Sequence, residues 1–163
     1  MRDVEDDAVQ VSEEGPWFDA FLSVHESRLR RALVAANGVQ IGNDACADAI
    51  AWAWEHRDRV IEMDHPVAYL FRVGQSAARR HRRWRREVSF PPESASVELP
   101  DGSPRLDAAL RRLTRRQRTV VILVHAHGWS YSEVAEALEV TDAAVRNQLH
   151  RGMQRLRADM ETP

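Results

Sequence analysis

Apolar residues recur along most of this chain at the three- and four-residue spacing of an amphipathic helix. In the first half, the spacing predicts three helices, at about 17–37, 43–60 and 67–86. Asn37-Gly38 is a stop signal for the first helix, Asn43 or Asp44 can cap the second, and Pro66 suits the first turn of the third. No segment alternates between apolar and polar residues as a strand does, so we expect an all-α protein.

The helical pattern is interrupted between Ser89 and Ser103. This stretch is rich in proline and serine and has almost no apolar periodicity, which is typical of a partly extended linker. Helical spacing resumes at about Pro104, continues through 117–127 and predicts two further helices. We therefore expect two small helical domains joined by a flexible proline-rich linker. The expected units are an acidic disordered tail at 1–15, a bundle of three or four helices at 16–87, the linker at 88–103 and a four-helix domain at 104–161.

The segment that starts at Ser130 has the spacing of a helix-turn-helix. Ser130 can cap a helix, with Glu133 as its capping-box partner three residues later. A small residue at 135 is followed at +5, +10 and +14 by Val140, Val145 and Leu149, the apolar skeleton of a DNA-binding helix-turn-helix. The turn usually has glycine where this chain has glutamate at 139. A left-handed conformation at that residue costs roughly 1 kcal/mol.

The second helix of this motif is expected to carry the side chains that read DNA. Its outward face offers donors for base edges in a major groove and for the phosphates beside it. These residues are Arg146, Asn147, His150, Arg151 and Arg155. The alternative interpretation is a solvated basic helix whose arginines near the C-terminus are favoured by the helix dipole.

Charge is distributed unevenly along the chain. Residues 1–64 carry 6 Arg against 14 Asp and Glu, a net charge of −8, whereas residues 65–163 carry 17 Arg against 11 acids, a net charge of +6. Between His65 and Arg86 there are 7 Arg and no acid. Such a local field attracts a polyanion although the whole chain has a net charge of −2. All basic residues are Arg, which suits phosphate and guanine contacts, but a GC-rich genome produces the same bias.

Several classes of protein are disfavoured. The single Cys46 rules out an intramolecular disulfide framework, and no apolar run approaches the roughly 18–20 residues that span a bilayer. With an acidic N-terminus unlike a secretory signal, we expect a cytoplasmic protein without membrane insertion. There is no glycine-rich phosphate loop and no metal signature. We attribute His125 and His127 to helix capping, and expect neither catalysis nor a cofactor or metal.

Five segments of the chain resemble the extracytoplasmic-function (ECF) sigma factors of bacteria. In the C-terminal half the resemblance lies in Leu113–Arg118, Gly128–Ala135 and Val145–Gly152, a pattern that response-regulator-type activators share. In the N-terminal half, His65–His81 resembles the helix that reads the promoter −10 element, and Asp44–Trp54 resembles the helix that binds core RNA polymerase. These blocks occur in the family's order around a linker of plausible length.

The resemblance implies a factor that directs core polymerase to promoters by recognising the −35 and −10 elements and assisting melting. Its expected partners are promoter DNA, the β′ clamp helices and β flap of core polymerase, and an anti-sigma factor. The residues implied for the −10 element and melting are Tyr69, Arg72, Ser76, Arg79, Arg80 and Arg83. Phe71 and Trp84 are further aromatic candidates that could equally belong to the core, and the loop Ile61–His65 matches the family's base-capture loop.

The core-polymerase site is expected on one face of the second helix, because its residues are spaced by three and four positions. They are Asp44, Asp48, Trp52 and Glu55. We expect Trp52 to be exposed as an interface anchor, with a partly covered surface tryptophan as the alternative, and Cys46, Ile50, Ala53 and Trp54 to face the core. Two rival functions keep the DNA-binding domain: a helix-turn-helix regulator that is not a sigma subunit, and a sigma-like protein held mainly by an inhibitory partner.

Overall fold

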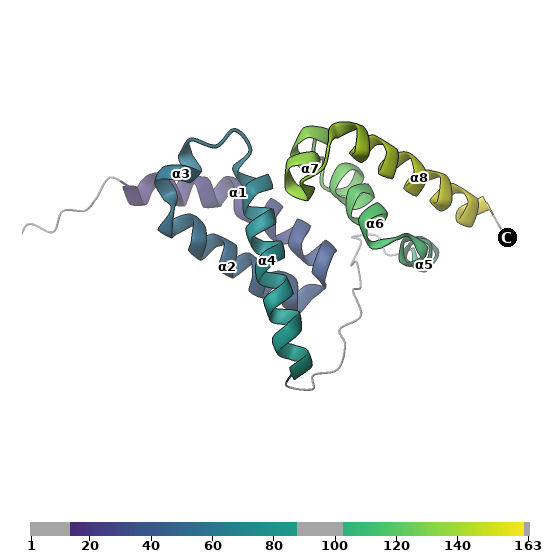
Figure 1. Cartoon of the computed structure of the whole chain (residues 1–163), viewed down its shortest axis with the longest axis horizontal. Helices are drawn as coiled ribbons and strands as arrows, with labels where there is room; N and C mark the ends of the chain where they lie inside the picture. The colour runs from purple at the N-terminus through teal and green to yellow at the C-terminus, as the bar shows by residue number, and fades with distance from the viewer. Residues whose placement is uncertain (1–13, 88–102, 162–163) are drawn as a thin grey trace, which may run out of the picture.

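Eight α-helices and one π-helical turn make up the part of the chain that the computed structural model describes, residues 14–87 and 103–161. The first group comprises α1 (Glu14–Asn37), α2 (Val39–Glu55), α3 (Arg57–Ile61) and α4 (Pro66–Glu87). The second comprises α5 (Pro104–Arg112), α6 (Arg115–Val121), η1 (Ile122–Ala126), α7 (Tyr131–Leu138) and α8 (Asp142–Glu161). The two groups lie side by side (Figure 1) and contain no strand within the described ranges, which confirms the all-α, two-domain prediction. The expected tail, up to residue 13, and the linker at 88–102 lie outside these ranges.

The N-terminal domain is built on the packing of α2 against both α1 and α4. Leu33, Ala45 and Phe71 are fully buried between these helices. Gly42 permits the close crossing of α1 and α2, because a Cβ atom there would lie 2.5 Å from the Cα of Val34. This crossing fixes the orientation of the two helices that carry the candidate polymerase and −10 residues.

The second helix differs from its predicted bounds at both ends. It begins at Val39 rather than near residue 43, because Gly38 adopts a positive φ of 86° and turns the chain directly from α1 into α2. It ends at Glu55, where His56 leaves helical geometry with φ −121° and separates α2 from α3. Asn43 and Asp44 are therefore interior helix residues and not caps. The predicted loop before Pro66 is present, at residues 62–65.

The C-terminal domain begins α6 and α7 with a capping box each. The Ser130 hydroxyl accepts from the backbone N–H of Glu133 at 3.2 Å, and Glu133 Oε2 accepts from the Ser130 N–H at 2.8 Å, as predicted. A second box joins Thr114 and Gln117 at the start of α6. The predicted helix over 117–127 is regular only to Val121 and continues as the π-helical turn η1.

The helix-turn-helix prediction is confirmed in detail by α7, the turn and α8. Glu139 is the one non-glycine residue of positive φ in the described ranges, with φ 53° and ψ 49°. The Thr141 hydroxyl accepts from the backbone N–H of Ala144 at 3.2 Å, so Thr141 rather than Asp142 caps α8. Val145 and Leu149 are buried against the preceding helices. The opposite face of α8 is thereby fixed toward solvent.

Candidate nucleic-acid and polymerase interface

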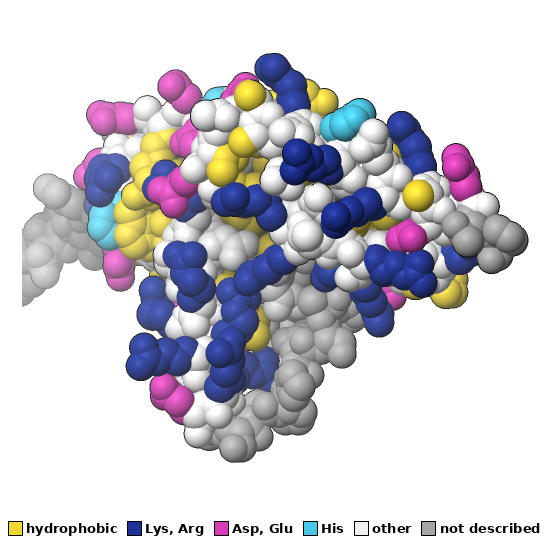
Figure 2. All heavy atoms as spheres, turned by 45° about the vertical axis from the view of Figure 1, so that its right-hand side comes forward, with side chains coloured by type: hydrophobic (Ala, Val, Ile, Leu, Met, Phe, Trp, Pro, Cys, Tyr) yellow, Lys and Arg dark blue, Asp and Glu magenta, His cyan; other side chains and the backbone are white. Residues whose placement is uncertain are grey.

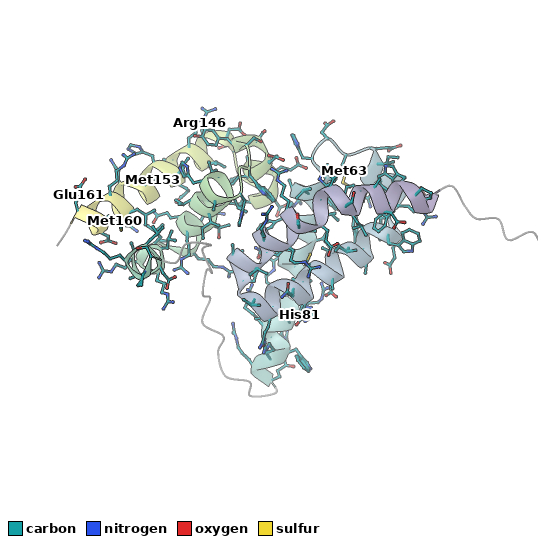
Figure 3. The ribbon with its side chains drawn as sticks, turned by 180° about the vertical axis from the view of Figure 1, so that it is seen from behind. Met63, His81, Arg146, Met153, Met160 and Glu161 are labelled. Atoms are coloured by element: carbon teal, nitrogen blue, oxygen red, sulfur yellow. The ribbon has the colours of Figure 1, made fainter. Side chains whose placement is uncertain are left out.

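The outward face of α8 carries the side chains predicted to read the −35 element. Its five residues are all exposed: Arg146, Asn147, His150, Arg151 and Arg155. The guanidinium of Arg146 lies 5.9 Å from the centre of the Tyr131 ring and points away from the body of the molecule (Figure 3). Arg155 Nη1 donates to Gln117 Oε1 at 3.0 Å, which ties the C-terminal part of this face to α6. The other four side chains of this face remain accessible from solvent.

One side of α4 carries the side chains predicted for the −10 element. Arg79, Arg80 and Arg83 are exposed, whereas Tyr69, Arg72 and Ser76 are half-buried. Figure 2 shows Arg side chains gathered along α4 and continuing over the C-terminal domain. The Arg72 guanidinium lies 5.5 Å from the centre of the Tyr69 ring. This side of α4 therefore combines guanidinium groups with an aromatic ring, as binding of an unstacked strand requires.

Two further aromatic residues of α4 lie in different environments. Phe71 is fully buried and belongs to the core, whereas Trp84 is 56% exposed near the end of the helix. The sequence left open whether Phe71 and Trp84 belong to the core. Phe71 does and is not available to a DNA base, whereas Trp84 lies at the surface. The expected base-capture loop keeps Ile61 exposed at its start.

A groove between α2 and α4 brings the candidate polymerase residues together with two candidate −10 residues. It has a volume of about 470 Å³ and is lined by Asp48, Trp52 and Glu55 from α2 and by Ser76 and Arg80 from α4, among others. Asp48 Oδ2 lies 3.0 Å from His81 Nε2 and 3.5 Å from Arg80 Nη2. Figure 3 places His81 on α4. Asp44 is exposed one turn earlier on α2, where it lines a neighbouring hollow with Trp84 and His81.

The two tryptophans of α2 lie opposite to the sequence prediction. Trp52 is half-buried: its ring stacks on His56 at a centroid distance of 4.1 Å and contacts Tyr69 at 5.2 Å. Trp54, predicted to be in the core, is 47% exposed and meets the Phe18 ring edge-on at 5.0 Å. Trp52 lies between His56, Arg59 of α3 and Tyr69 of α4, whereas Trp54 contacts Phe18 of α1 and Arg57 of α3 and keeps nearly half of its surface exposed.

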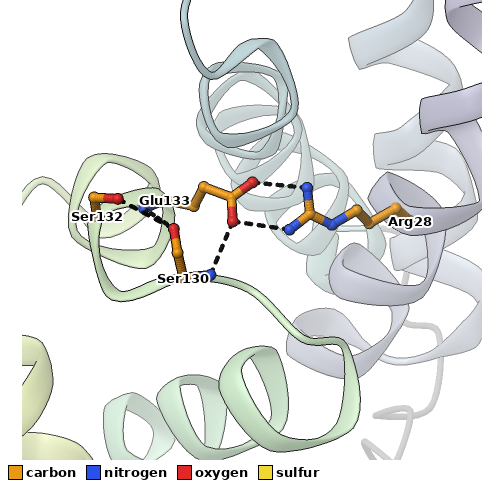
Figure 4. A network of polar contacts seen from close by, with 4 residues as sticks. All are labelled: Arg28, Ser130, Ser132 and Glu133. Carbon is orange, nitrogen blue, oxygen red and sulfur yellow. Dashed lines mark hydrogen bonds and ion pairs between the residues drawn. The ribbon is translucent and has the colours of Figure 1, made fainter.

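The two domains are joined by an ion pair that sequence reasoning missed. Arg28 of α1 donates to both carboxylate oxygens of Glu133 in α7, at 2.7 and 2.9 Å (Figure 4). Hydrogen bonding to Arg28 lowers the pKa of Glu133 from 4.5 to about 2, against the opposing effect of burial. Glu133 thus serves the capping box and the domain interface at once. The sequence signalled only the cap, because the partner lies 105 residues away.

Aromatic packing surrounds this ion pair. The ring of Trp129, 2% exposed, meets Phe71 edge-on at a centroid distance of 5.6 Å, and the Arg28 guanidinium lies 5.0 Å from the Trp129 ring centre. A second ion pair joins Arg72 Nη2 to Glu139 Oε1 at 2.5 Å. Arg72, predicted for the −10 element, therefore bonds the helix-turn-helix itself in this arrangement.

The described ranges, 14–87 and 103–161, contain no group of three or more His, Cys, Asp or Glu arranged to hold a metal ion. Burial lowers the pKa of His127, the residue that follows η1. Among the described helices, none is long and apolar enough to cross a membrane.

Comparison with known sequences gives a family match for the C-terminal domain and relatives for most of the chain. Residues 103–156 match the family model for sigma-70, region 4. The ECF RNA polymerase sigma factor SigL of Mycobacterium tuberculosis (strain ATCC 25618 / H37Rv) is 26% identical over 144 residues, which cover 81% of this chain and 81% of SigL. RNA polymerase sigma factor CarQ of Myxococcus xanthus is 33% identical over 101 residues, 56% of this chain and 58% of CarQ.

Solved structures share the fold of the whole described chain. The sigma factor RpoE, in a complex with the anti-sigma factor NepR from Bartonella quintana, matches with a TM-score of 0.71 and 22% identity, over 89% of this chain and 97% of RpoE. CnrH, in a complex with the cytosolic domain of CnrY, matches with a TM-score of 0.61 and 24% identity, over 88% of this chain and 87% of CnrH.

The described chain thus combines an exposed helix-turn-helix face in one domain with an arginine-bearing helix in the other. Residues 103–156 match sigma-70, region 4, and the chain is similar over most of its length to an ECF sigma factor. These findings support a promoter-directing RNA polymerase sigma factor.

Proposed function

We propose that the two domains hold the two promoter elements separately. The domain at 104–161 reads the −35 element through the exposed face of α8, with Arg146, Asn147, His150 and Arg151 at base edges and Arg155 at a phosphate. The domain at 16–87 binds the −10 element and the melted strand along α4. Tyr69 stacks on an unpaired base there, Arg72, Arg79 and Arg83 bind phosphates, and Ser76 lies between them. Neither role needs a catalytic group, and we propose a non-catalytic function in the cytoplasm.

The groove between α2 and α4 is the proposed contact for core polymerase. Asp48 and Glu55 supply carboxylates, Trp52 supplies a partly covered aromatic surface, and Asp44 extends the acidic side along α2. An aromatic anchor among charged groups is typical of a protein interface, and we assign this groove to the β′ clamp helices. Arg80 shares the groove and pairs with Asp48, so it borders both the DNA and the polymerase surface. The β flap is the proposed second contact, on the C-terminal domain.

The single observation that carries this proposal is the pair of arginine-bearing faces on helices of different domains. Elements named −35 and −10 are separated by about 25 base pairs, or roughly 85 Å of duplex. Because α4 and α8 both pack against α7, two helices of 22 and 20 residues, about 33 and 30 Å long, cannot present their faces so far apart. Both elements therefore cannot be held while Arg28 and Glu133 keep the domains in contact. We propose that the domains separate when the promoter is bound.

An inhibitory protein partner is a further proposal. The two structural relatives were solved with an anti-sigma factor, NepR, and with the cytosolic domain of CnrY. A partner that kept the domains of this chain together would prevent simultaneous binding of the two elements.

Run-off transcription with purified core polymerase and genomic promoter fragments tests the function. The wild-type chain is expected to give discrete start sites, and D48R combined with W52A is expected to abolish both transcription and core binding. The matched control is E136A, which changes a partly buried glutamate of α7 outside both grooves. A folded wild-type chain that binds DNA but never binds core polymerase would instead be a helix-turn-helix regulator.

A further inference from the structure

A second groove runs between the two domains and is strongly cationic. It has a volume of about 510 Å³ and lies between α4 on one side and α6 with the end of α7 on the other. Five arginines line it: Arg72, Arg79 and Arg82 from the N-terminal domain, and Arg115 and Arg116 from the C-terminal domain. Glu139 is the one carboxylate in its lining, and Glu139 pairs with Arg72.

The remaining four arginines have no carboxylate partner among the residues of the two described ranges. Two of them, from opposite domains, share one neutral acceptor: Arg82 Nη1 and Arg115 Nη2 donate to Asn37 Oδ1 at 2.6 and 3.2 Å. Asn37 is buried, and its Nδ2 donates to the carbonyl of Leu33 at 2.9 Å, which fixes the amide oxygen toward the arginines.

Like charges drawn together in this way repel each other unless an anion joins them. The strain is visible in Arg82, whose pKa is lowered by burial and by the charges of Arg115, Arg79 and Arg86. An anion between these guanidinium groups would offset the repulsion and accept their hydrogen bonds. Because the arginines come from both domains, a compact ligand with several negative charges would bridge them.

We propose that this groove binds an oligophosphate, a chain of two or three phosphates that is either free or carried by a nucleoside. Guanidinium groups bind phosphate oxygens in bidentate fashion, and a volume of about 510 Å³ lies in the range of small-ligand sites. Neutral side chains of Gln75, Ser76 and Thr119 supply further hydrogen-bonding groups. Under the proposed separation of the domains, Arg115 and Arg116 leave the site, so promoter DNA would not contact all five arginines together.

The bound anion has a consequence for the sigma function. A ligand that binds only the packed arrangement stabilises that arrangement. It also occupies Arg72 and Arg79, two residues proposed for the −10 strand, and so competes with promoter DNA. This consequence rests on the proposed function, whereas binding of the anion does not.

Isothermal titration calorimetry of the full-length chain, without DNA or polymerase, tests the binding. The probes are sodium tripolyphosphate, GTP and orthophosphate. We expect one site per chain for tripolyphosphate and GTP, and roughly tenfold weaker binding of orthophosphate, which can bridge fewer guanidinium groups. Affinity should fall as salt is raised, as expected for charge-assisted contacts.

Two arginine variants and a matched control locate the site. R116Q changes an exposed arginine of α6 in the lining, so it tests the site with little risk to folding, and R115Q removes one of the two donors to Asn37. Each is expected to weaken tripolyphosphate binding by roughly tenfold. R111Q, an exposed arginine of α5 outside the groove, should bind as the wild type does.

Three results are decisive. Equal affinities for GTP and tripolyphosphate assign the contacts to the phosphates, and tighter binding of GTP adds a contact to the nucleoside; both outcomes support the site. No measurable binding of tripolyphosphate overturns the proposal. Equal losses in R116Q and R111Q would also overturn it, because they would show an unspecific response to net charge.

Discussion

The two arginine-bearing faces differ in what surrounds them. On α8, Arg146 and Arg151 are exposed and have no carboxylate partner within the described ranges. On α4, Arg72 pairs with Glu139, Arg80 with Asp48 and Arg83 with Glu87. The face on α8 is ready for a duplex as it stands. Among the proposed −10 arginines of α4, Arg79 has no carboxylate partner in the described ranges, and we propose that the other three exchange their acidic partners for phosphates when the promoter is bound.

This difference follows from the kind of DNA that each face is proposed to bind. Duplex DNA exposes its grooves while its base pairs are intact, whereas a melted strand exists only after base pairs have been broken. We propose that the pairing of Arg72 with Glu139 and of Arg80 with Asp48 weakens binding of single strands by the free protein. The Arg28–Glu133 ion pair is one of the contacts that hold the domains together, beside the Arg72–Glu139 pair and the packing of Phe71 on Trp129.

The largest effect is expected from E133A. It leaves the partly buried Arg28 without its partner and removes half of the capping box, which together should lower the free energy of unfolding by about 2–4 kcal/mol. Denaturant unfolding measures this loss. E136A, on the same helix, is the matched control and should cost less than about 0.5 kcal/mol.

The same ion pair predicts a dependence on pH. The pKa of Glu133 is about 2 in the folded chain against an ordinary value of 4.5, so its ionised form stabilises the fold fully above pH 4.5. This contribution should be lost as the pH falls from 4.5 toward 2. Unfolding experiments on the wild type and E133Q should therefore show a difference in stability that shrinks over this range. A constant difference would show that the carboxylate charge does not stabilise the interface.

Removal of Arg146 or Arg151 should weaken binding of duplex −35 DNA by roughly tenfold or more, since each good contact to a base edge contributes about 1–3 kcal/mol. Fluorescence anisotropy with a labelled duplex measures the affinity. R111A, which removes an equal charge from α5, should bind nearly as the wild type. Identical losses in all three variants would mean that α8 acts only through its charge.

A smaller difference in DNA affinity is expected between two arginine variants of α4. R79A should weaken binding of a single-stranded −10 oligonucleotide by roughly tenfold, whereas R80A should weaken it only about threefold, because Arg80 already pairs with Asp48. The titration is done at low salt with the same oligonucleotide. The reverse order would show that Asp48 does not compete with the DNA for Arg80.

The smallest effect is expected from E139G in the turn. Glycine removes the cost of a left-handed glutamate, roughly 1 kcal/mol, but loses the exposed ion pair with Arg72, worth up to about 1 kcal/mol. We expect little net change in the wild type and a gain of up to about 1 kcal/mol in an R72A background. Thermal unfolding of the four variants of this cycle separates the two contributions, and no gain in R72A would exclude strain at this residue.

Features that depend on neighbouring residues were predictable from the sequence. The Ser130–Glu133 box, the left-handed Glu139 and the buried Val145 and Leu149 each arise within one turn or one helix crossing, so their residue types and spacing suffice. The second capping box, at Thr114, carries the same signal and could have been found in the same way. The exposed face of α8 follows from these local constraints.

Features that depend on distant residues were not predictable. The exposures of Trp52 and Trp54 are decided by their contacts with α1, α3 and α4, which helical spacing does not report. The early start of α2 depends on the positive φ of Gly38, which the sequence suggested only as a helix end. Neither the Arg28–Glu133 pair nor the shared contact of Arg82 and Arg115 has a signal in the spacing of residues, because each joins separate domains.

The distance between the two domains during transcription initiation tests most directly whether they separate to bind the two promoter elements. Fluorescent labels are attached to S27C in α1 and R111C in α5, two exposed positions, while the natural Cys46 is fully buried and should not react. Energy transfer is measured for the free protein and for the complex with core polymerase and promoter DNA. We predict high transfer in the free chain and a large drop in the complex, corresponding to a separation greater by tens of ångströms. Unchanged transfer in a complex that initiates transcription would contradict the proposal that the domains must part.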